Sequence, residues 1–147
     1  MHFITCHNTI RNALPIVAAG CIAALVTGCA PAGPKTVSVS GKIAYGGGAW
    51  PKPGKLTFPC IEPADGFPNR PGSAEFDVDG NFVASSYGQG DGLHPGKYTV
   101  NVECWEVPPS MDGLTPPKSY VPADFRAEFE VQPSDRALIF HWDVPIN

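Results

Sequence analysis

Histidine and aspartate are the side chains of this sequence with the clearest potential for catalysis. After residue 28 the only histidines are His94 and His141, and histidine is the side chain that changes charge near neutral pH. A zinc site needs three or four ligands, and no His or Cys spacing supplies them. No Gly-x-Ser-x-Gly nucleophile turn is present. We therefore expect no catalytic residue, no metal and no cofactor, with a hydrolase that uses Asp91 or His94 as a remote alternative.

Two acidic segments stand next to glycines. Asp77 and Asp79, followed by Gly80, look like the start of a calcium loop. The twelfth position counted from Asp77 is Gly88, however, where an EF-hand needs a bidentate glutamate. Asp-Gly between alternating apolar residues is typical of a hairpin turn. We predict structural turn roles for Asp79 and Gly80 and for Asp91, with cation binding at Asp91 as the less favoured alternative.

Two tryptophans are candidates for contact with a ligand. Trp50 lies in a Gly/Pro-rich segment, and Trp105 has the outward parity of its predicted strand. Exposed tryptophans stack on sugars or mark protein contacts. The alternative is that loops fold over both rings. Trp142 has inward parity and is expected to pack in the core.

The elements that position these residues are predicted to be strands. No segment after residue 28 has a sustained apolar period of 3.6, whereas alternation with period two recurs. Each strand has one apolar face, which it must bury against a second sheet. The sequence predicts an all-β, seven-stranded antiparallel sandwich, with strands within residues 36–45, 55–60, 97–107, 125–131 and 137–144 and a hairpin over 73–86.

Composition and charge restrict the class of protein further. The chain has 16 glycines and 17 prolines, together 33 of 147 residues or about 22%. This share is below the roughly 25–30% that is typical of unfolded low-complexity chains. A hydrophobic share of 43% supplies one modest core, so one domain is expected. The net charge of −4 argues against nucleic acid as a partner, because such binders carry a basic patch.

The N-terminal residues have the pattern of an export signal. Residues 13–27 are uncharged and largely apolar, and Arg11 is the only charged side chain before them. The segment Val26-Thr27-Gly28-Cys29-Ala30 resembles a bacterial lipobox. The resemblance implies cleavage between Gly28 and Cys29 and lipidation of Cys29, and several acyl chains give stable anchoring. Plain secretion and an uncleaved anchor are the alternatives.

This interpretation divides the chain into a signal peptide (1–28), a lipidated tether (29–35) and one domain (36–147). After cleavage 119 residues remain, with nine Lys and Arg against 14 Asp and Glu, a net charge of −5. The expected location is the bacterial cell envelope, on the extracytoplasmic side of a membrane that holds the lipid anchor.

Six short motifs follow one another along the chain: Val39–Ile43, Gly54–Phe58, Phe76–Phe82, Gly90–Gly92, Leu93–Val100 and Pro117–Tyr120. Their order resembles that of the carboxypeptidase regulatory-like domains, which are transthyretin-like (prealbumin-like), Ig-like sandwiches. The resemblance spans Thr36–Val144. It also makes Tyr98, after Pro95-Gly96, similar to the tyrosine corner of Ig-like sandwiches. A hydrolase of purine catabolism shares this fold, but its C-terminal Tyr-Arg-Gly-Ser motif is absent.

Cys60 and Cys104 are candidates for a disulfide, because they share inward parity and an oxidising compartment is expected. Closure of that loop would stabilise the fold by roughly 4 kcal/mol. In the transthyretin-like topology, however, the two residues end neighbouring antiparallel strands. They would then lie at opposite ends of the sheet, beyond the roughly 7 Å Cα limit. A disulfide and two free thiols both remain open.

Together these features predict a lipid-anchored, non-enzymatic envelope protein with an Ig-like binding or structural module for an unidentified ligand. An envelope protein or a glycan is the expected kind of partner. The alternative function is a carbohydrate-binding module that uses Trp50 and Trp105. The fold by itself does not decide between them.

Overall fold

The computed structural model describes residues 35–111 and 113–146. The predicted signal peptide, the cleavage site between Gly28 and Cys29, and the tether as far as residue 34 lie outside these residues. The described part of the chain contains strands and no helix, which confirms the all-β prediction.

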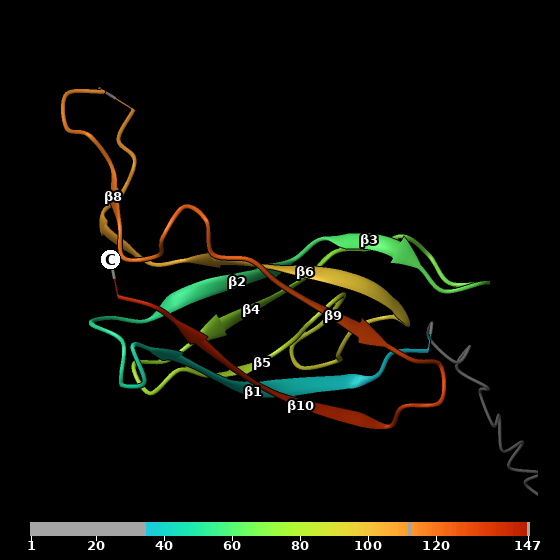
Figure 1. Cartoon of the computed structure of the whole chain (residues 1–147). Coiled ribbons are helices and arrows are strands. Elements are labelled where there is room, and N and C mark those ends of the chain that lie inside the picture. The colour runs from blue at the N-terminus through green and yellow to red at the C-terminus, as the bar shows by residue number, and fades with distance from the viewer. Residues whose placement is uncertain (1–34, 112, 147) are drawn as a thin grey trace, which may run out of the picture. The chain divides into compact units, whose positions relative to one another are not determined.

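Ten strands form two sheets (Figure 1). Eight of them make one mixed sheet in the order β10-β1-β5-β4-β2-β6-β3, with β9 paired to β6, while β7 and β8 form a small second sheet. The strands are β1 (Ser38–Tyr45), β2 (Gly54–Phe58), β3 (Cys60–Pro63), β4 (Gly72–Phe76), β5 (Asn81–Val83), β6 (Gly96–Glu103), β7 (Trp105–Val107), β8 (Lys118–Ser119), β9 (Ala127–Val131) and β10 (Ala137–Val144).

The prediction of seven antiparallel strands is wrong in the number of strands, which is ten, and in the direction of one strand pair. β1 and β10 pair in parallel over eight residues, from Ser38 opposite Ala137 to Tyr45 opposite Val144. The two backbones approach so closely that a Cβ at Gly41 would overlap the carbonyl oxygen of Phe140. Local alternation predicts strands but not their partners, so this pairing of the first and last strands had no signal in the sequence.

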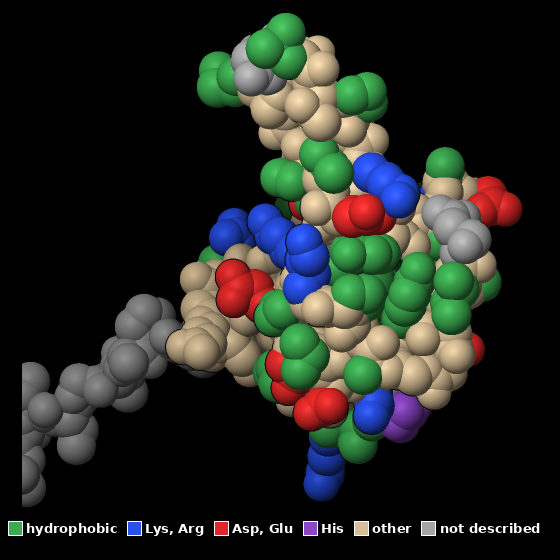
Figure 2. All heavy atoms as spheres, turned by 90° about the vertical axis from the view of Figure 1, so that its left-hand side faces the viewer, with side chains coloured by type: hydrophobic (Ala, Val, Ile, Leu, Met, Phe, Trp, Pro, Cys, Tyr) green, Lys and Arg blue, Asp and Glu red, His purple; other side chains and the backbone are tan. Residues whose placement is uncertain are grey.

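Two of the predicted strands are divided in the structure. β2 and β3 are separated only by Pro59 and pair with the two halves of β6 in one register as far as Cys60, after which an irregularity between Cys60 and Glu62 shifts the pairing by one residue. Proline cannot donate a hydrogen bond to the sheet, but the Pro59 carbonyl still accepts one from the amide of Thr99 at 3.1 Å. At Cys104 the chain leaves β6 and continues as β7, which with β8 forms an arm that projects from the body (Figure 1, Figure 2).

The sheet curls so that β2, β3 and β6 face β1 and β10 across an aromatic core (Figure 1). The Phe58 ring lies 6.4 Å from that of Trp142, and the Phe129 ring packs against Tyr98 at 5.5 Å. Trp142 stacks on Phe82 at 5.4 Å, in agreement with its predicted inward parity. This curl turns the polar side chains of β2, β4 and β5 toward solvent, and these form the site described next.

A candidate binding groove on the outer face of the sheet

The outward side chains of three central strands line the candidate site. Leu56, Ala74 and Phe82 are buried, so their strand neighbours Lys55, Glu75, Asn81 and Val83 project to the opposite face. Lys55 of β2 stands opposite Glu75 of β4 on one side and opposite Glu103 of β6 on the other. The register of the sheet therefore gathers one cation and two carboxylates on one outer face.

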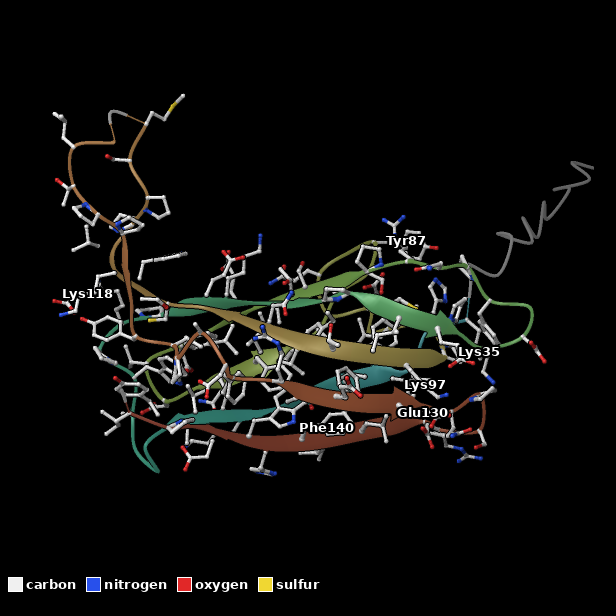
Figure 3. The ribbon with its side chains drawn as sticks, turned by 45° about the horizontal axis from the view of Figure 1, so that its top comes forward. Lys35, Tyr87, Lys97, Lys118, Glu130 and Phe140 are labelled. Atoms are coloured by element: carbon white, nitrogen blue, oxygen red, sulfur yellow. The ribbon has the colours of Figure 1, made fainter. Side chains whose placement is uncertain are left out.

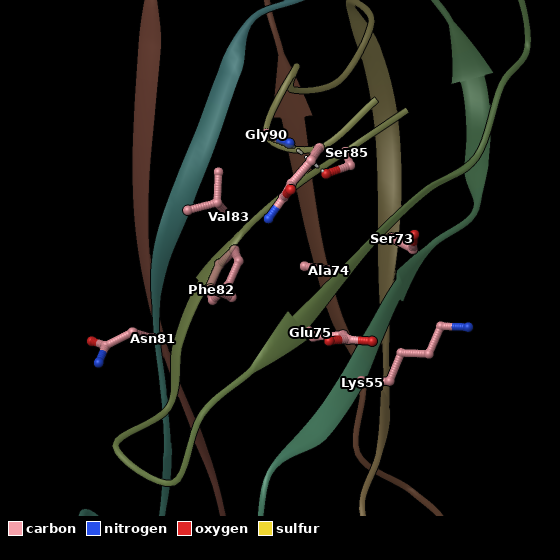
Figure 4. A pocket seen from close by; sticks show the side chains of 10 residues that line it. Lys55, Ser73, Ala74, Glu75, Asn81, Phe82, Val83, Ser85 and Gly90 are labelled. Carbon is pink, nitrogen blue, oxygen red and sulfur yellow. Dashed lines mark hydrogen bonds between the residues drawn. The ribbon is translucent and has the colours of Figure 1, made fainter. Parts of the chain in front are cut away.

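A hollow of about 830 Å³ lies over β4 and β5 (Figure 4). Val83 contributes an outward apolar side chain, and Lys55, Glu75, Asn81 and Ser73 supply polar groups. Ala74 and Phe82, whose side chains point inward, border the hollow from their strands. Gln89 and Gly90, from the loop after β5, line it as well.

A second hollow of about 750 Å³ continues from the first toward the arm. Lys55, Glu75 and Asn81 line both hollows, so the two are halves of one surface, which we call the outer groove. Its far half adds Glu103 and Trp105 among its lining residues. The outer groove thus extends from the loop at residues 86–92 to the first residue of β7.

Asp91 shapes the loop at the first end of the groove. Its carboxylate accepts hydrogen bonds from the amides of Ser86 (2.7 Å), Gly88 (2.9 Å) and Tyr87 (3.0 Å). Desolvation opposes ionisation, but these backbone N–H groups outweigh it and lower the pKa of the Asp91 carboxyl. The amide of Gly90 donates to the Ser85 hydroxyl at 2.8 Å (Figure 4). Asp91 therefore has a structural turn role here.

The hairpin turn between β4 and β5 forms the opposite side of the groove. The Asp77 carboxylate accepts hydrogen bonds from the side-chain Nδ2 of Asn81 (3.0 Å) and from the backbone amide of Asn81 (2.9 Å). Both bonds lower the pKa of Asp77. Gly80 has φ of +83°, and a Cβ there would overlap the carbonyl oxygen of Ile43. Asp79 and Gly80 occupy the turn, but the carboxylate that holds the turn belongs to Asp77.

The two candidate tryptophans have different environments. Trp50 is only 4% exposed, its ring stacks on Tyr45 at 5.0 Å, and its Nε1 donates to the Ile43 carbonyl at 2.8 Å. The prediction of a ligand contact at Trp50 is therefore wrong, because a hydrogen bond and ring packing draw the loop onto the core. Trp105 is half-buried and lines the outer groove.

The candidate disulfide is not formed, and both Cys60 and Cys104 are free thiols. Cys60 stands opposite Tyr98 in the pairing of β3 with β6, and Cys104 follows the end of β6. Six residues of extended strand span about 20 Å, whereas a disulfide needs Cα atoms within about 7 Å. Burial raises the pKa of the Cys104 thiol, whose Sγ donates to the Lys52 carbonyl at 3.6 Å.

His94 has a structural position in the fold. Its side chain is fully buried, with Nδ1 2.9 Å from the Lys35 carbonyl oxygen and Nε2 2.9 Å from the Tyr87 hydroxyl. A carbonyl only accepts, so Nδ1 carries the proton and Nε2 accepts from Tyr87. The buried Tyr98 hydroxyl donates to the His94 carbonyl at 2.9 Å, the contact that a tyrosine corner makes. Neither ring nitrogen of His94 is open to a substrate.

His141 lies exposed on β10, far along the chain from these groups. Among residues 35–111 and 113–146 no group of three or more His, Cys, Asp or Glu side chains is arranged to hold a metal ion. The same residues contain no helix that could cross a bilayer. Sequence reasoning missed Lys55, Glu75, Asn81 and Glu103 as site residues, because outward charged positions occur on every strand and only the pairing of β2, β4 and β6 brings these together.

Comparisons of the chain with family models, with curated proteins and with solved structures find no match. The resemblance to carboxypeptidase regulatory-like domains therefore contributes to the function only as a proposal.

Proposed function

We propose that the protein is a lipid-anchored envelope protein whose domain, a prealbumin-like, Ig-like sandwich, is a non-enzymatic binding module. The lipobox at Gly28-Cys29 supports the anchor, since it follows an uncharged apolar segment. The curled sheet with an aromatic interior supports the sandwich.

The outer groove is the observation that carries the binding function. Among the described residues the ion pairs are Lys97–Glu62 and Lys118–Glu106. Lys55, Glu75 and Glu103 thus keep their charged groups available to a ligand, although they stand side by side in the sheet. Asp91 and His94, the residues considered for hydrolysis, instead hold the loop and the core.

The position of the groove also suits an anchored domain. Lys35, where the tether joins the domain, lies at the opposite end from Lys118 of the arm (Figure 3). Lys35 itself is held there, because its carbonyl accepts from His94 and its Nζ donates to the Pro133 carbonyl at 2.6 Å. A domain anchored through Lys35 would present the arm, and the Trp105 half of the groove beside it, away from the membrane.

Lipid labelling of the full chain in a bacterial host tests this proposal. We expect palmitate label on the wild-type protein, its recovery with membranes, and loss of both in Cys29→Ser. The matched control is Cys21→Ser, which changes a cysteine inside the predicted signal peptide and should leave labelling intact. Label that persists in Cys29→Ser, or a protein that keeps residues 1–28, would overturn the anchored assignment.

A further inference from the structure

The outer groove has the shape of a site for a chain-like ligand. Small-molecule pockets are clefts or cavities of roughly 300–1,000 Å³ that bury most of the surface of their ligand. Here two open hollows of about 830 and 750 Å³ adjoin along the sheet. Along β4 and the residue that follows it, the lining continues from Ser73 in the first hollow to Asp77 in the second, about 13 Å of extended chain. Such a trough suits several linked units of a polymer.

The pairing of the strands excludes one common way of binding a peptide. A peptide that joins a sheet by main-chain hydrogen bonds needs an unpaired edge. β5 lies between β1 and β4, β4 between β5 and β2, and β2 between β4 and β6. All three are central strands, so the groove offers side chains only.

The charges of the groove disfavour an acidic polymer. Glu75, Asp77 and Glu103 line it together with Lys52 and Lys55, so acidic side chains exceed basic ones. Polyanions bind where basic residues accumulate. With three acidic and two basic side chains the charges nearly balance, which suits a neutral ligand rich in groups that both donate and accept hydrogen bonds.

Sugar hydroxyls are uncharged, and each can both donate and accept hydrogen bonds. Lys55 only donates hydrogen bonds, Glu75 and Glu103 only accept them, and the amides of Asn81 and Gln89 do both. Trp105 adds aromatic surface at the arm end, against which the apolar face of a sugar ring can pack. A hydroxyl-rich chain can satisfy the whole set without a charge of its own.

We infer that the outer groove binds a neutral polysaccharide chain, with Lys55, Glu75 and Asn81 in contact with its hydroxyl groups and Trp105 against a sugar ring. This inference rests on the proposed binding function and specifies its ligand class. It moves the carbohydrate contact from Trp50, which is buried, to the outer face of β2, β4 and β5.

Isothermal titration of the full, detergent-solubilised lipoprotein tests the inference. The probes are hexasaccharides of N-acetylglucosamine, of β-linked glucose and of α-linked glucose, with free glucose and heparin for comparison. We expect at least one neutral hexasaccharide to bind more tightly than glucose, and heparin not to bind. Absence of binding to all three at millimolar concentration, or preferential binding of heparin, would overturn the inference.

Matched variants locate the site. Lys55→Ala and Trp105→Ala should each weaken binding about tenfold or more, the effect of losing a hydrogen bond to a charged group or a stacked ring. Lys42→Ala, an outward lysine of β1 outside the groove, should change nothing. Glu75→Gln keeps the shape of the side chain and should also weaken binding, whereas Glu128→Gln on β9 should not. Equal affinities for all variants with unchanged thermal unfolding would refute the groove as the site. Lipid labelling of Cys29 in the same preparations separates this failure from a failure of the anchored assignment.

Discussion

Replacement of Tyr98 by phenylalanine should destabilise the fold through one buried hydrogen bond. The Tyr98 side chain is fully buried, and its hydroxyl donates to the His94 carbonyl at 2.9 Å. Loss of a donor that leaves a buried acceptor unpaired costs about 1–3 kcal/mol. For a domain of this size each kcal/mol lowers the melting temperature by roughly 4 °C, so we expect a decrease of about 4–12 °C.

The matched control is Tyr45→Phe, because the half-buried Tyr45 hydroxyl makes no hydrogen bond within the part of the chain that the structure covers. Denaturant and thermal unfolding of both variants against the wild type, followed by circular dichroism, measure the difference. A Tyr98→Phe protein as stable as Tyr45→Phe would refute the role assigned to this hydroxyl.

The same substitution should alter stability at alkaline pH. Desolvation raises the pKa of Tyr98 well above its ordinary value of 10.0, and the neighbouring Cys60 thiol adds to the effect. Above that ordinary value the unfolded chain releases the proton first, so stability falls as the pH rises toward the folded-state pKa. Tyr98→Phe lacks this ionisable group. The difference in the free energy of unfolding between the wild type and the variant should therefore shrink above pH 10. A deficit that stays constant to the alkaline limit would contradict the assignment.

Three further substitutions or measurements test other contacts. Asp91→Asn should speed hydrogen exchange at the amides of residues 86–88, which donate to the Asp91 carboxylate. Because the pKa of Asp91 is lowered, the loop of the wild-type protein should loosen only as the pH falls below 3.8. Equal exchange rates in the variant and the wild type would contradict the turn role of Asp91. Gly41→Ala should destabilise by several kcal/mol because its Cβ overlaps the β10 backbone, whereas Gly48→Ala, with its nearest neighbour at 3.6 Å, should be nearly neutral in urea unfolding. Alkylation of the denatured, unreduced protein should modify both Cys60 and Cys104, and mass spectrometry that finds them protected would indicate a disulfide.

Local alternation predicted most of the strands and most of the buried side chains, but it missed β8 and placed Val78 inward, where the structure exposes it. Phe76 and Phe82, on either side of the Asp79-Gly80 turn, point inward as their parity requires. Proline and glycine also indicated where the strands are interrupted. The sequence did not predict that the chain continues as β3 beyond Pro59, where the Pro59 carbonyl still accepts a hydrogen bond from β6.

The environment of Trp50 had to come from the tertiary structure. A tryptophan among glycines and prolines suggests an exposed loop. In the structure, however, Nε1 of Trp50 donates to the Ile43 carbonyl, and its ring packs against Tyr45 and Phe76. These partners lie within the core, and no local pattern encodes that meeting.

By itself the sequence determined the all-β class, the inward face of most strands and the turns at Asp77–Gly80 and Asp91, because these depend on neighbours within a few residues. The tertiary structure alone decided the parallel pairing of β1 with β10, the separation of Cys60 from Cys104, and the meeting of Lys55, Glu75 and Glu103 on one outer face. Each of these joins segments far apart in the chain. Their registers result from the packing of the whole core, which strand periodicity does not specify.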